Sequence, residues 1–163
     1  MSTVYIGLGS NLDNPAQQLQ GAVDSLKSLP ETKFILASSL FSSKPMGPQD
    51  QPDYMNAVVC IETELSPLAL LDQLQAIELA FGRVRKDERW GARVLDLDIL
   101  LIDDLVIENE RLTVPHYGMK VREFVIYPLA QINPELVLPD GSNVTQLQEK
   151  IDDNGLIIVG ELR

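Results

Sequence analysis

Two aspartates, Asp96 and Asp98, stand in the apolar run L-D-L-D-I-L-L-I over residues 95–102. In a β-strand, residues two apart face the same side with Cα atoms about 7 Å apart, so both carboxylates project together. A buried carboxylate is costly unless a positive group compensates it. Carboxylates in this arrangement suit Mg²⁺, which usually keeps waters and joins protein carboxylates to substrate phosphates. The strand is therefore a candidate site for metal and phosphate, with Asp96 and Asp98 as metal ligands.

The stretch before these aspartates, residues 82–93, contains five Lys and Arg residues. Arginine N–H groups can bind the phosphate oxygens that a metal leaves uncovered. Metal and arginine together would supply the compensation that the carboxylates need. A purely structural alternative stays open on spacing alone, in which the aspartates pair with Arg93 or Arg89 on a solvated sheet face.

The distribution of charge favours a small anionic ligand. Residues 83–122 contain eight of the 13 Lys and Arg residues and eight acidic residues, so the rest of the chain has the whole net charge of −11. The low pI, near 4.4, argues against broad binding to nucleic acid or to anionic membranes. The N-terminal residues lack a basic segment followed by a long apolar run, and no stretch approaches the roughly 18 apolar residues of a membrane span. We therefore expect a cytoplasmic protein.

Other phosphate-binding and catalytic motifs are not found. The sequence G-L-G-S-N-L over residues 7–12 has Leu12 where a dinucleotide fingerprint needs its third glycine, so we predict a turn over residues 7–11. His116 is the only histidine, and the sequence shows neither a Cys and His cluster for zinc nor a Ser, His and acid set. The aspartate pair is thus the main chemical signal.

The hydrophobic pattern predicts the order strand, helix, strand, strand, helix, strand. We expect strands at residues 4–8, 34–41, 54–63 and 95–102, a first helix capped by Asp13 or Asn14 with Pro15 at its first position, and a second helix from Ser66 and Pro67 to a stop at Gly82. This order predicts an α+β fold, a ferredoxin-like two-layer αβ sandwich with an antiparallel sheet. A short strand at 105–107 and helices at 122–131 and 144–151 would follow as a C-terminal helical extension. At this length we expect one domain, residues 1–163.

Three segments of the chain closely resemble the family of 6-hydroxymethyl-7,8-dihydropterin pyrophosphokinases of folate biosynthesis. They read G-P-Q-D-Q-P-D-Y-M-N (47–56), G-R-V-R-K-D-E-R-W-G-A-R-V-L-D-L-D-I-L (82–100) and R-L-T-V-P-H-Y (111–117), and the similarity runs from Tyr5 to about Asp140. The resemblance implies a ferredoxin-like enzyme that transfers pyrophosphate from ATP to the pterin hydroxymethyl oxygen and releases AMP. It further implies two Mg²⁺ ions that arrive with ATP. From the resemblance and the acidic charge together, we expect ATP and the pterin as partners, no nucleic-acid or membrane partner, and a monomer.

The resemblance also assigns functions to individual residues. Asp96 and Asp98 match the ligands of both metals, and Arg83 and Arg93 match catalytic arginines of a mobile loop. The residues that match the ATP site are Gln75, Glu78, Arg85, Arg89, Trp90, Ile99, Arg111, Leu112, Thr113, His116, Tyr117 and Arg122. The residues that match the pterin site are Ser43, Lys44, Pro45, Met46, Tyr54, Asn56 and Phe124, with Tyr54 and Phe124 as the two stacking rings. Lys44 and Glu123 depart from the family pattern on the pterin side.

Two other functions remain open from the sequence. One is an ATP-dependent kinase on the same scaffold that transfers a single phosphoryl group and releases ADP. The other is a ferredoxin-like module that binds a small molecule or nucleic acid without catalysis; the acidic charge and the lack of interleaved aromatics on the strands disfavour nucleic acid.

Overall fold

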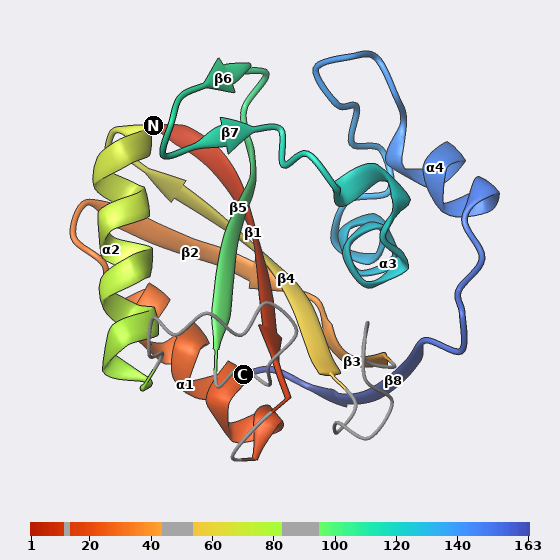
Figure 1. Cartoon of the computed structure of the whole chain (residues 1–163), viewed down its shortest axis with the longest axis horizontal. Coiled ribbons are helices and arrows are strands. Elements are labelled where there is room, and N and C mark those ends of the chain that lie inside the picture. Colours follow the sequence, from red (N-terminus) through yellow and green to blue (C-terminus); the bar gives the residue numbers. More distant parts are fainter. Residues whose placement is uncertain (12–13, 44–53, 83–94) are drawn as a thin grey trace.

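The computed structural model describes residues 1–11, 14–43, 54–82 and 95–163 (Figure 1). Its elements, in chain order, are β1 (Ser2–Ser10), α1 (Pro15–Lys27), β2 (Thr32–Ala37), β3 (Ser39–Ser43), β4 (Tyr54–Thr63), α2 (Pro67–Ala80), β5 (Asp96–Ile102), β6 (Ile107–Glu108), β7 (Thr113–Val114), a 3₁₀ turn η1 (Met119–Val121), α3 (Glu123–Ile132), α4 (Val144–Lys150) and β8 (Ile157–Glu161).

The main sheet is antiparallel, and β1 lies inside it between β4 and β5. The strand order is β5-β1-β4-β3-β8, and β2 pairs with β4 beside β3. The order of elements from β1 to β5 is strand, helix, strand, strand, helix, strand once β2 and β3 are taken as one broken strand. The predicted α+β, ferredoxin-like sandwich with an antiparallel sheet is confirmed.

Helices cover both faces of this sheet (Figure 1). On one face, α1 and α2 enclose a core to which they contribute Leu19, Val23, Leu70 and Leu74, all fully buried. On the other face, α3 and α4 form a second core around Tyr5, Val58 and Leu100 of the strands. The predicted C-terminal helical extension is therefore a second helical layer against the sheet. It leaves part of the sheet uncovered over β1 and β5.

The sequence patterns of the two long helices predict most of their details correctly. The four residues Leu19, Ala22, Val23 and Leu26 are the buried face of α1, as their spacing predicts. Ser66 caps α2 by accepting a hydrogen bond on its hydroxyl from the backbone N–H of Ala69, at 3.2 Å. Asn14 does not cap α1 with its side chain, because it adopts a left-handed conformation with φ 67° and makes no such bond; Asp13 lies outside the described residues.

Three strand predictions were wrong in detail. The glycine-containing stretch 7–10 belongs to β1 and is not a turn. The predicted strand 34–41 is broken at Ser38, whose hydroxyl accepts a hydrogen bond from the backbone N–H of Val58 at 3.0 Å and so replaces a regular ladder contact. The short strand expected at 105–107 forms one to two residues later as β6, where it pairs with β7.

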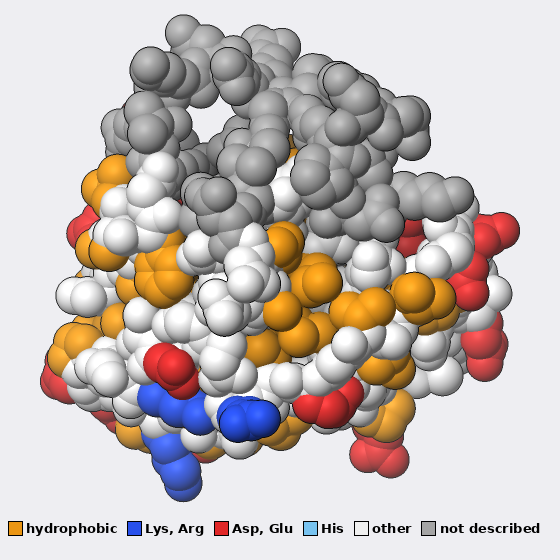
Figure 2. All heavy atoms as spheres, turned by 90° about the horizontal axis from the view of Figure 1, so that it is seen from below, with side chains coloured by type: hydrophobic (Ala, Val, Ile, Leu, Met, Phe, Trp, Pro, Cys, Tyr) orange, Lys and Arg blue, Asp and Glu red, His pale blue; other side chains and the backbone are white. Residues whose placement is uncertain are grey.

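Strand β8 was not predicted, although I-I-V within residues 157–161 is a β-branched run. It pairs with β3 at the edge of the sheet, and Ile157, Ile158 and Val159 stay exposed. Figure 2 shows one face of the molecule, on which apolar side chains lie at the surface among acidic ones. No helix of the described residues is long and apolar enough to cross a membrane.

Candidate active site

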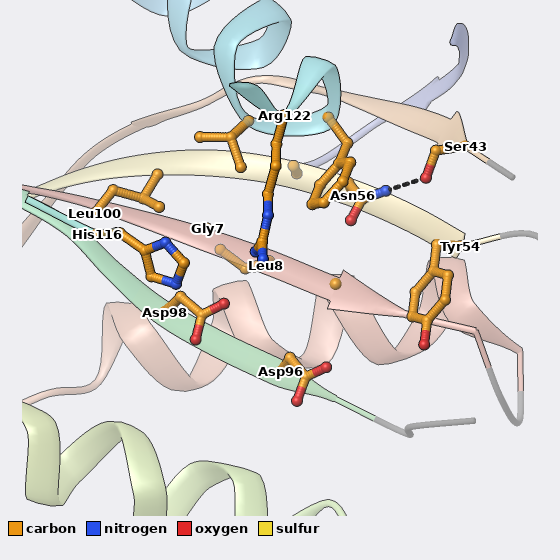
Figure 3. A pocket seen from close by; sticks show the side chains of 14 residues that line it. Gly7, Leu8, Ser43, Tyr54, Asn56, Asp96, Asp98, Leu100, His116 and Arg122 are labelled. Carbon is orange, nitrogen blue, oxygen red and sulfur yellow. Dashed lines mark hydrogen bonds between the residues drawn. The ribbon is translucent and has the colours of Figure 1, made fainter. Parts of the chain in front are cut away.

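A cavity of about 240 Å³ opens over β1, β4 and β5, beside the first turn of α3 (Figure 3). Its lining combines the two aspartates of the sequence motif with aromatic, amide and cationic side chains from other elements. The lining residues are Gly7, Leu8, Gly9, Ser43, Tyr54, Asn56, Ala57, Asp96, Asp98, Leu100, His116, Arg122, Phe124 and Val125.

Glycines of β1 form part of the cavity floor. A Cβ atom at Gly9 would lie 3.2 Å from Oδ1 of Asn56, which is closer than ordinary van der Waals contact, and one at Gly7 would meet Leu100 at 3.5 Å. Side chains on this stretch of β1 would therefore narrow the cavity and press on Asn56. The glycines that looked like a turn in the sequence instead leave space above a continuous strand.

Asp96 and Asp98 project from β5 toward this cavity on one face of the strand (Figure 3). Leu97 between them points the other way into the core and is 4% exposed. The alternation is that of a regular strand, as the sequence predicts. The structural arrangement thus confirms that the pair shares a face, while its use as a metal site stays a prediction.

Glu78 of α2 holds this strand from the side opposite β1. Its Oε2 accepts a hydrogen bond from the backbone N–H of Leu97 at 2.9 Å, and the residue is only 5% exposed. In the described part of the sheet β5 pairs with β1 alone, so its outer N–H groups have no neighbouring strand. The carboxylate takes that place at Leu97, between the two aspartates, and fixes β5 against α2.

His116 reaches the cavity from the loop after β7, close to Asp98 (Figure 3). Its Nδ1 accepts a hydrogen bond from the backbone N–H of Gly118 at 3.2 Å, which leaves Nε2 to hold the proton of the neutral ring. Burial lowers the pKa of His116 below its ordinary value of 6.5; the negative charge of Asp98 opposes this shift and the positive charge of Arg122 adds to it. At neutral pH the ring is therefore an uncharged N–H donor.

Arg122 is held in the cavity wall at the start of α3. Its guanidinium carbon lies 5.8 Å from the ring centre of Tyr117 and 5.7 Å from that of Phe124, within the range of cation–π attraction. A Cβ at Gly118 would approach the same guanidinium to 2.9 Å, so a larger residue there would shift the arginine from this position. The arginine is thus placed by three neighbours before any ligand binds.

The end of the cavity away from His116 combines a buried amide with aromatic side chains. The amide Nδ2 of Asn56 donates a hydrogen bond to Oγ of Ser43 at 2.7 Å, and both residues are buried (Figure 3). Tyr54 at the start of β4 and Phe124 in the first turn of α3 add aromatic surface. A buried amide beside two rings is suited to a planar heterocycle.

Most of the sequence matches one known family. The family described as 7,8-dihydro-6-hydroxymethylpterin-pyrophosphokinase (HPPK) matches residues 5–134. The chain belongs to the HPPK family. This confirms the resemblance seen in the sequence motifs.

Curated HPPK relatives align along nearly the full chain. A 2-amino-4-hydroxy-6-hydroxymethyldihydropteridine pyrophosphokinase of Haemophilus influenzae is 55% identical over 157 residues, covering 96% of this chain and 98% of that protein. The protein of the same name from Pseudomonas aeruginosa is 54% identical over 144 residues, 88% of each chain.

Solved structures show the same fold. A crystal structure of HPPK-DHPS A437G from Plasmodium falciparum superposes with a TM-score of 0.72 at 15% sequence identity. The match covers 91% of this chain and 45% of that longer chain. At this low identity the superposition supports the HPPK fold alone.

The cavity collects eight of the residues that the HPPK resemblance assigned from sequence. They are Ser43, Tyr54, Asn56, Asp96, Asp98, His116, Arg122 and Phe124. Tyr117 stands at the margin, 82% exposed, with its ring stacked on His116 at a centroid distance of 4.7 Å. Thr113 is exposed on β7.

Four other assigned residues lie away from the cavity lining. Ile99 and Leu112 are buried in the core beneath α1 and α2, at 4% and 7% exposure. Gln75 and Arg111 contact each other on the α2 side. The structure shows no contact of these four with the cavity, so their assignment to the ATP site stays a prediction, as does that of Glu78.

Eight assigned residues lie outside the described residues, and their assignments also stay predictions. They are Lys44, Pro45 and Met46 on the pterin side and Arg83, Arg85, Arg89, Trp90 and Arg93 before β5. Glu123 departs from the family pattern and belongs to the described residues. Its Oε1 accepts a hydrogen bond from Nδ2 of Asn154 at 3.2 Å, and it does not line the cavity.

Replacing Glu78 should loosen β5. In Glu78→Ala the N–H of Leu97 loses its acceptor, and a buried donor left without one costs about 1–3 kcal/mol in the free energy of unfolding. Glu78→Gln keeps an oxygen at the same position and should lose less. Chemical denaturation measures the loss, and hydrogen exchange of the Leu97 amide locates it. Glu149→Ala, at an exposed position of α4, is the control, and an equal loss in that variant would contradict the assignment of Glu78.

The histidine should titrate below its ordinary pKa of 6.5 in the metal-free protein. Because the chain has one histidine, a single Cε1–H resonance reports it in an NMR titration. Asp98→Asn should lower the pKa further, since it removes the nearby negative charge. The folded state then binds fewer protons than the unfolded state, so the free energy of unfolding should decrease as pH falls below about 6.5. A pKa at or above 6.5, or an upward shift in Asp98→Asn, would show that the local electrostatics are misassigned.

Proposed function

We propose that this chain transfers pyrophosphate from ATP to the hydroxymethyl oxygen of 6-hydroxymethyl-7,8-dihydropterin. The products are the pterin pyrophosphate ester and AMP, in a step of tetrahydrofolate biosynthesis. Membership of the HPPK family supports this activity. The observation that supports it most directly is the cavity that Asp96 and Asp98 line together with the buried Asn56 amide and aromatic rings.

The pterin would bind at the end of the cavity formed by Ser43, Tyr54, Asn56 and Phe124. Its flat ring system can stack on Phe124 and Tyr54, and its amide and amino edge requires polar partners. The hydrogen bond from Asn56 to Ser43 fixes the orientation of the Asn56 amide before the ligand arrives. Such a fixed amide lowers the ordering cost of binding. Lys44, Pro45 and Met46 complete this end in the proposal.

The triphosphate of ATP would lie toward β5, with Arg122 and His116 beside it. Arg122 supplies positive charge that its aromatic neighbours already hold in place. His116 offers its neutral Nε2–H, because Nδ1 is used as an acceptor. The ATP site would also include Gln75, Glu78, Arg85, Arg89, Trp90, Ile99, Arg111, Leu112, Thr113 and Tyr117.

The residues present fit two Mg²⁺ ions that arrive with ATP. Among the described residues there is no group of three or more His, Cys, Asp or Glu side chains that could hold a metal. In the proposal, Asp96 and Asp98 are the protein ligands. Two carboxylates with remaining positions for water and phosphate oxygens are a typical Mg²⁺ donor set. When bound, the metal neutralises charge that develops on the phosphate oxygens.

No residue of the chain has to act as a strong base. Phosphoryl-type transfer depends mainly on alignment of the reacting groups and on charge neutralisation. The cavity walls orient the pterin, β5 fixes both carboxylates, and Arg122 places charge at the phosphates. In the proposal, Arg83 and Arg93 add further positive charge at the phosphates. We further propose that residues 1–163 act as a single domain, as a cytoplasmic monomer.

The reaction is tested by its nucleotide product. With ATP, Mg²⁺ and hydroxymethyl-dihydropterin, the chain should form AMP and the pterin pyrophosphate ester. Asp96→Asn and Asp98→Asn should each lower turnover by about a hundredfold or more, because each removes charge needed at the phosphates. Asp104→Asn, an exposed aspartate just beyond β5, is the matched control and should retain activity.

Formation of ADP would show a single phosphoryl transfer and overturn the pyrophosphokinase proposal. The absence of any nucleotide turnover with the pterin would favour a binding module instead. Normal turnover in both aspartate variants would show that the pair does not serve the reaction.

Phe124→Ala should weaken pterin binding by about 1–3 kcal/mol, the scale of a lost ring stack, and leave the affinity for ATP nearly unchanged. Phe124→Leu keeps apolar volume without a ring, so its affinity for the pterin should lie between those of the original chain and of Phe124→Ala. Separate titrations of each ligand by calorimetry measure both affinities. Equal losses for pterin and ATP would place the pterin elsewhere in the cavity.

A further inference from the structure

Arg111 is engaged by two side chains of α2. Its Nη2 lies 2.5 Å from Oδ1 of Asp72 and donates a second hydrogen bond to Oε1 of Gln75 at 3.3 Å. The backbone also fixes its position, because the N–H of Arg111 donates to Oδ1 of Asn109 at 2.9 Å. Gln75 was singled out in the sequence, but Asp72 was not.

Both contacts use the same nitrogen of the guanidinium. An arginine binds an anion most tightly through two parallel N–H bonds, donated either by Nε and Nη2 or by Nη1 and Nη2. Each of these two arrangements uses one hydrogen of Nη2. With both Nη2 hydrogens directed at Asp72 and Gln75, the remaining N–H groups can offer a phosphate single bonds only. A two-bond contact with phosphate therefore requires release from Asp72 or from Gln75, and of these two only the Asp72 carboxylate also offsets the positive charge that Arg111 would present to phosphate.

Asp72 and Gln75 lie on the face of α2 that also contains Glu78, since the three follow at steps of three residues. Glu78 bonds the backbone of β5 between Asp96 and Asp98. Along one face of α2, Asp72 and Gln75 therefore contact Arg111, and Glu78 contacts β5, the strand of the aspartate pair. Arg111 itself does not line the cavity.

We propose that Asp72 is a positioning residue that holds Arg111 on α2 in the nucleotide-free protein and competes with ATP for its guanidinium. We call this contact the Asp72 latch. The proposal rests on the proposed function, in which Arg111 belongs to the ATP site. It differs from that function because it makes Asp72, which touches no substrate, a determinant of ATP affinity.

The expected effect is modest because the pair is exposed. The side chains of Arg111 and Asp72 are 46% and 61% exposed, so solvent screens their attraction. Exposed ion pairs of this kind change equilibria by about two- to fivefold. Asp72→Asn keeps the shape and a neutral oxygen but removes the charge, so ATP should bind about two- to fivefold more tightly.

The test is a double-mutant cycle on nucleotide affinity. Calorimetry with Mg²⁺ and α,β-methylene-ATP, which cannot be cleaved at the reacting bond, measures the dissociation constant for the original chain, Asp72→Asn, Arg111→Ala and the double variant. We expect the gain in Asp72→Asn to vanish when Arg111 is absent. The affinity for the pterin and the thermal midpoint should stay unchanged in Asp72→Asn, which separates the latch from a merely structural role.

Glu149→Gln on α4 removes the same unit of charge far along the chain from α2 and controls for net charge. An unchanged or weaker affinity in Asp72→Asn would overturn the latch, and so would an equal gain in the Arg111→Ala background or in Glu149→Gln. Failure of the original chain to bind the analogue would overturn the proposed function together with the latch. Normal binding without the Asp72 effect would overturn the latch alone.

Discussion

The fixed position of β5 is the constraint on which the site depends. Asp96 and Asp98 can act together only if the strand between them is rigid, and β5 has a paired strand on one side only among the described residues. Glu78 supplies the missing acceptor to Leu97, while Leu97 and Ile99 fill the core beneath. Burial of alternate leucines and one buried carboxylate therefore fix the two acidic side chains at the cavity.

The second core explains why a cavity exists at all. A two-layer sandwich would leave this face of the sheet open to water, but α3 and α4 cover part of it through contacts with Tyr5, Val58 and Leu100. The uncovered remainder lies between α3 and β5, over the glycines of β1. Its walls come from the sheet and from the start of α3, so the aromatic rings of Tyr54 and Phe124 and the carboxylates of Asp96 and Asp98 line one cavity. Electrostatic interactions in such a cavity are stronger than in bulk water.

Local contacts prepare several side chains before any ligand is present. Asn56 is oriented by Ser43, Arg122 by two rings and Gly118, and His116 by the backbone of the same residue Gly118. Arg111 is held as well, but by the carboxylate of Asp72. Prepared groups reduce the entropy lost on binding, whereas a contact to an acidic side chain has to be exchanged for the ligand. We therefore expect the preorganised groups to raise the affinity for a ligand and the contact of Arg111 with Asp72 to lower it.

The sequence by itself determined the fold class, the aspartate pair and the family. Periodicity shows which faces of α1 and α2 are buried, and alternation places Asp96 and Asp98 on one side, because both are local patterns. The family resemblance identifies eight of the residues that line the cavity. Only the tertiary structure decided what depends on distant contacts. Glycines 7 and 9 read as a turn because glycine permits one, yet pairing with β4 and β5 makes them strand. Asp72 had no signal beyond its helical spacing, since its partner Arg111 is 39 residues away.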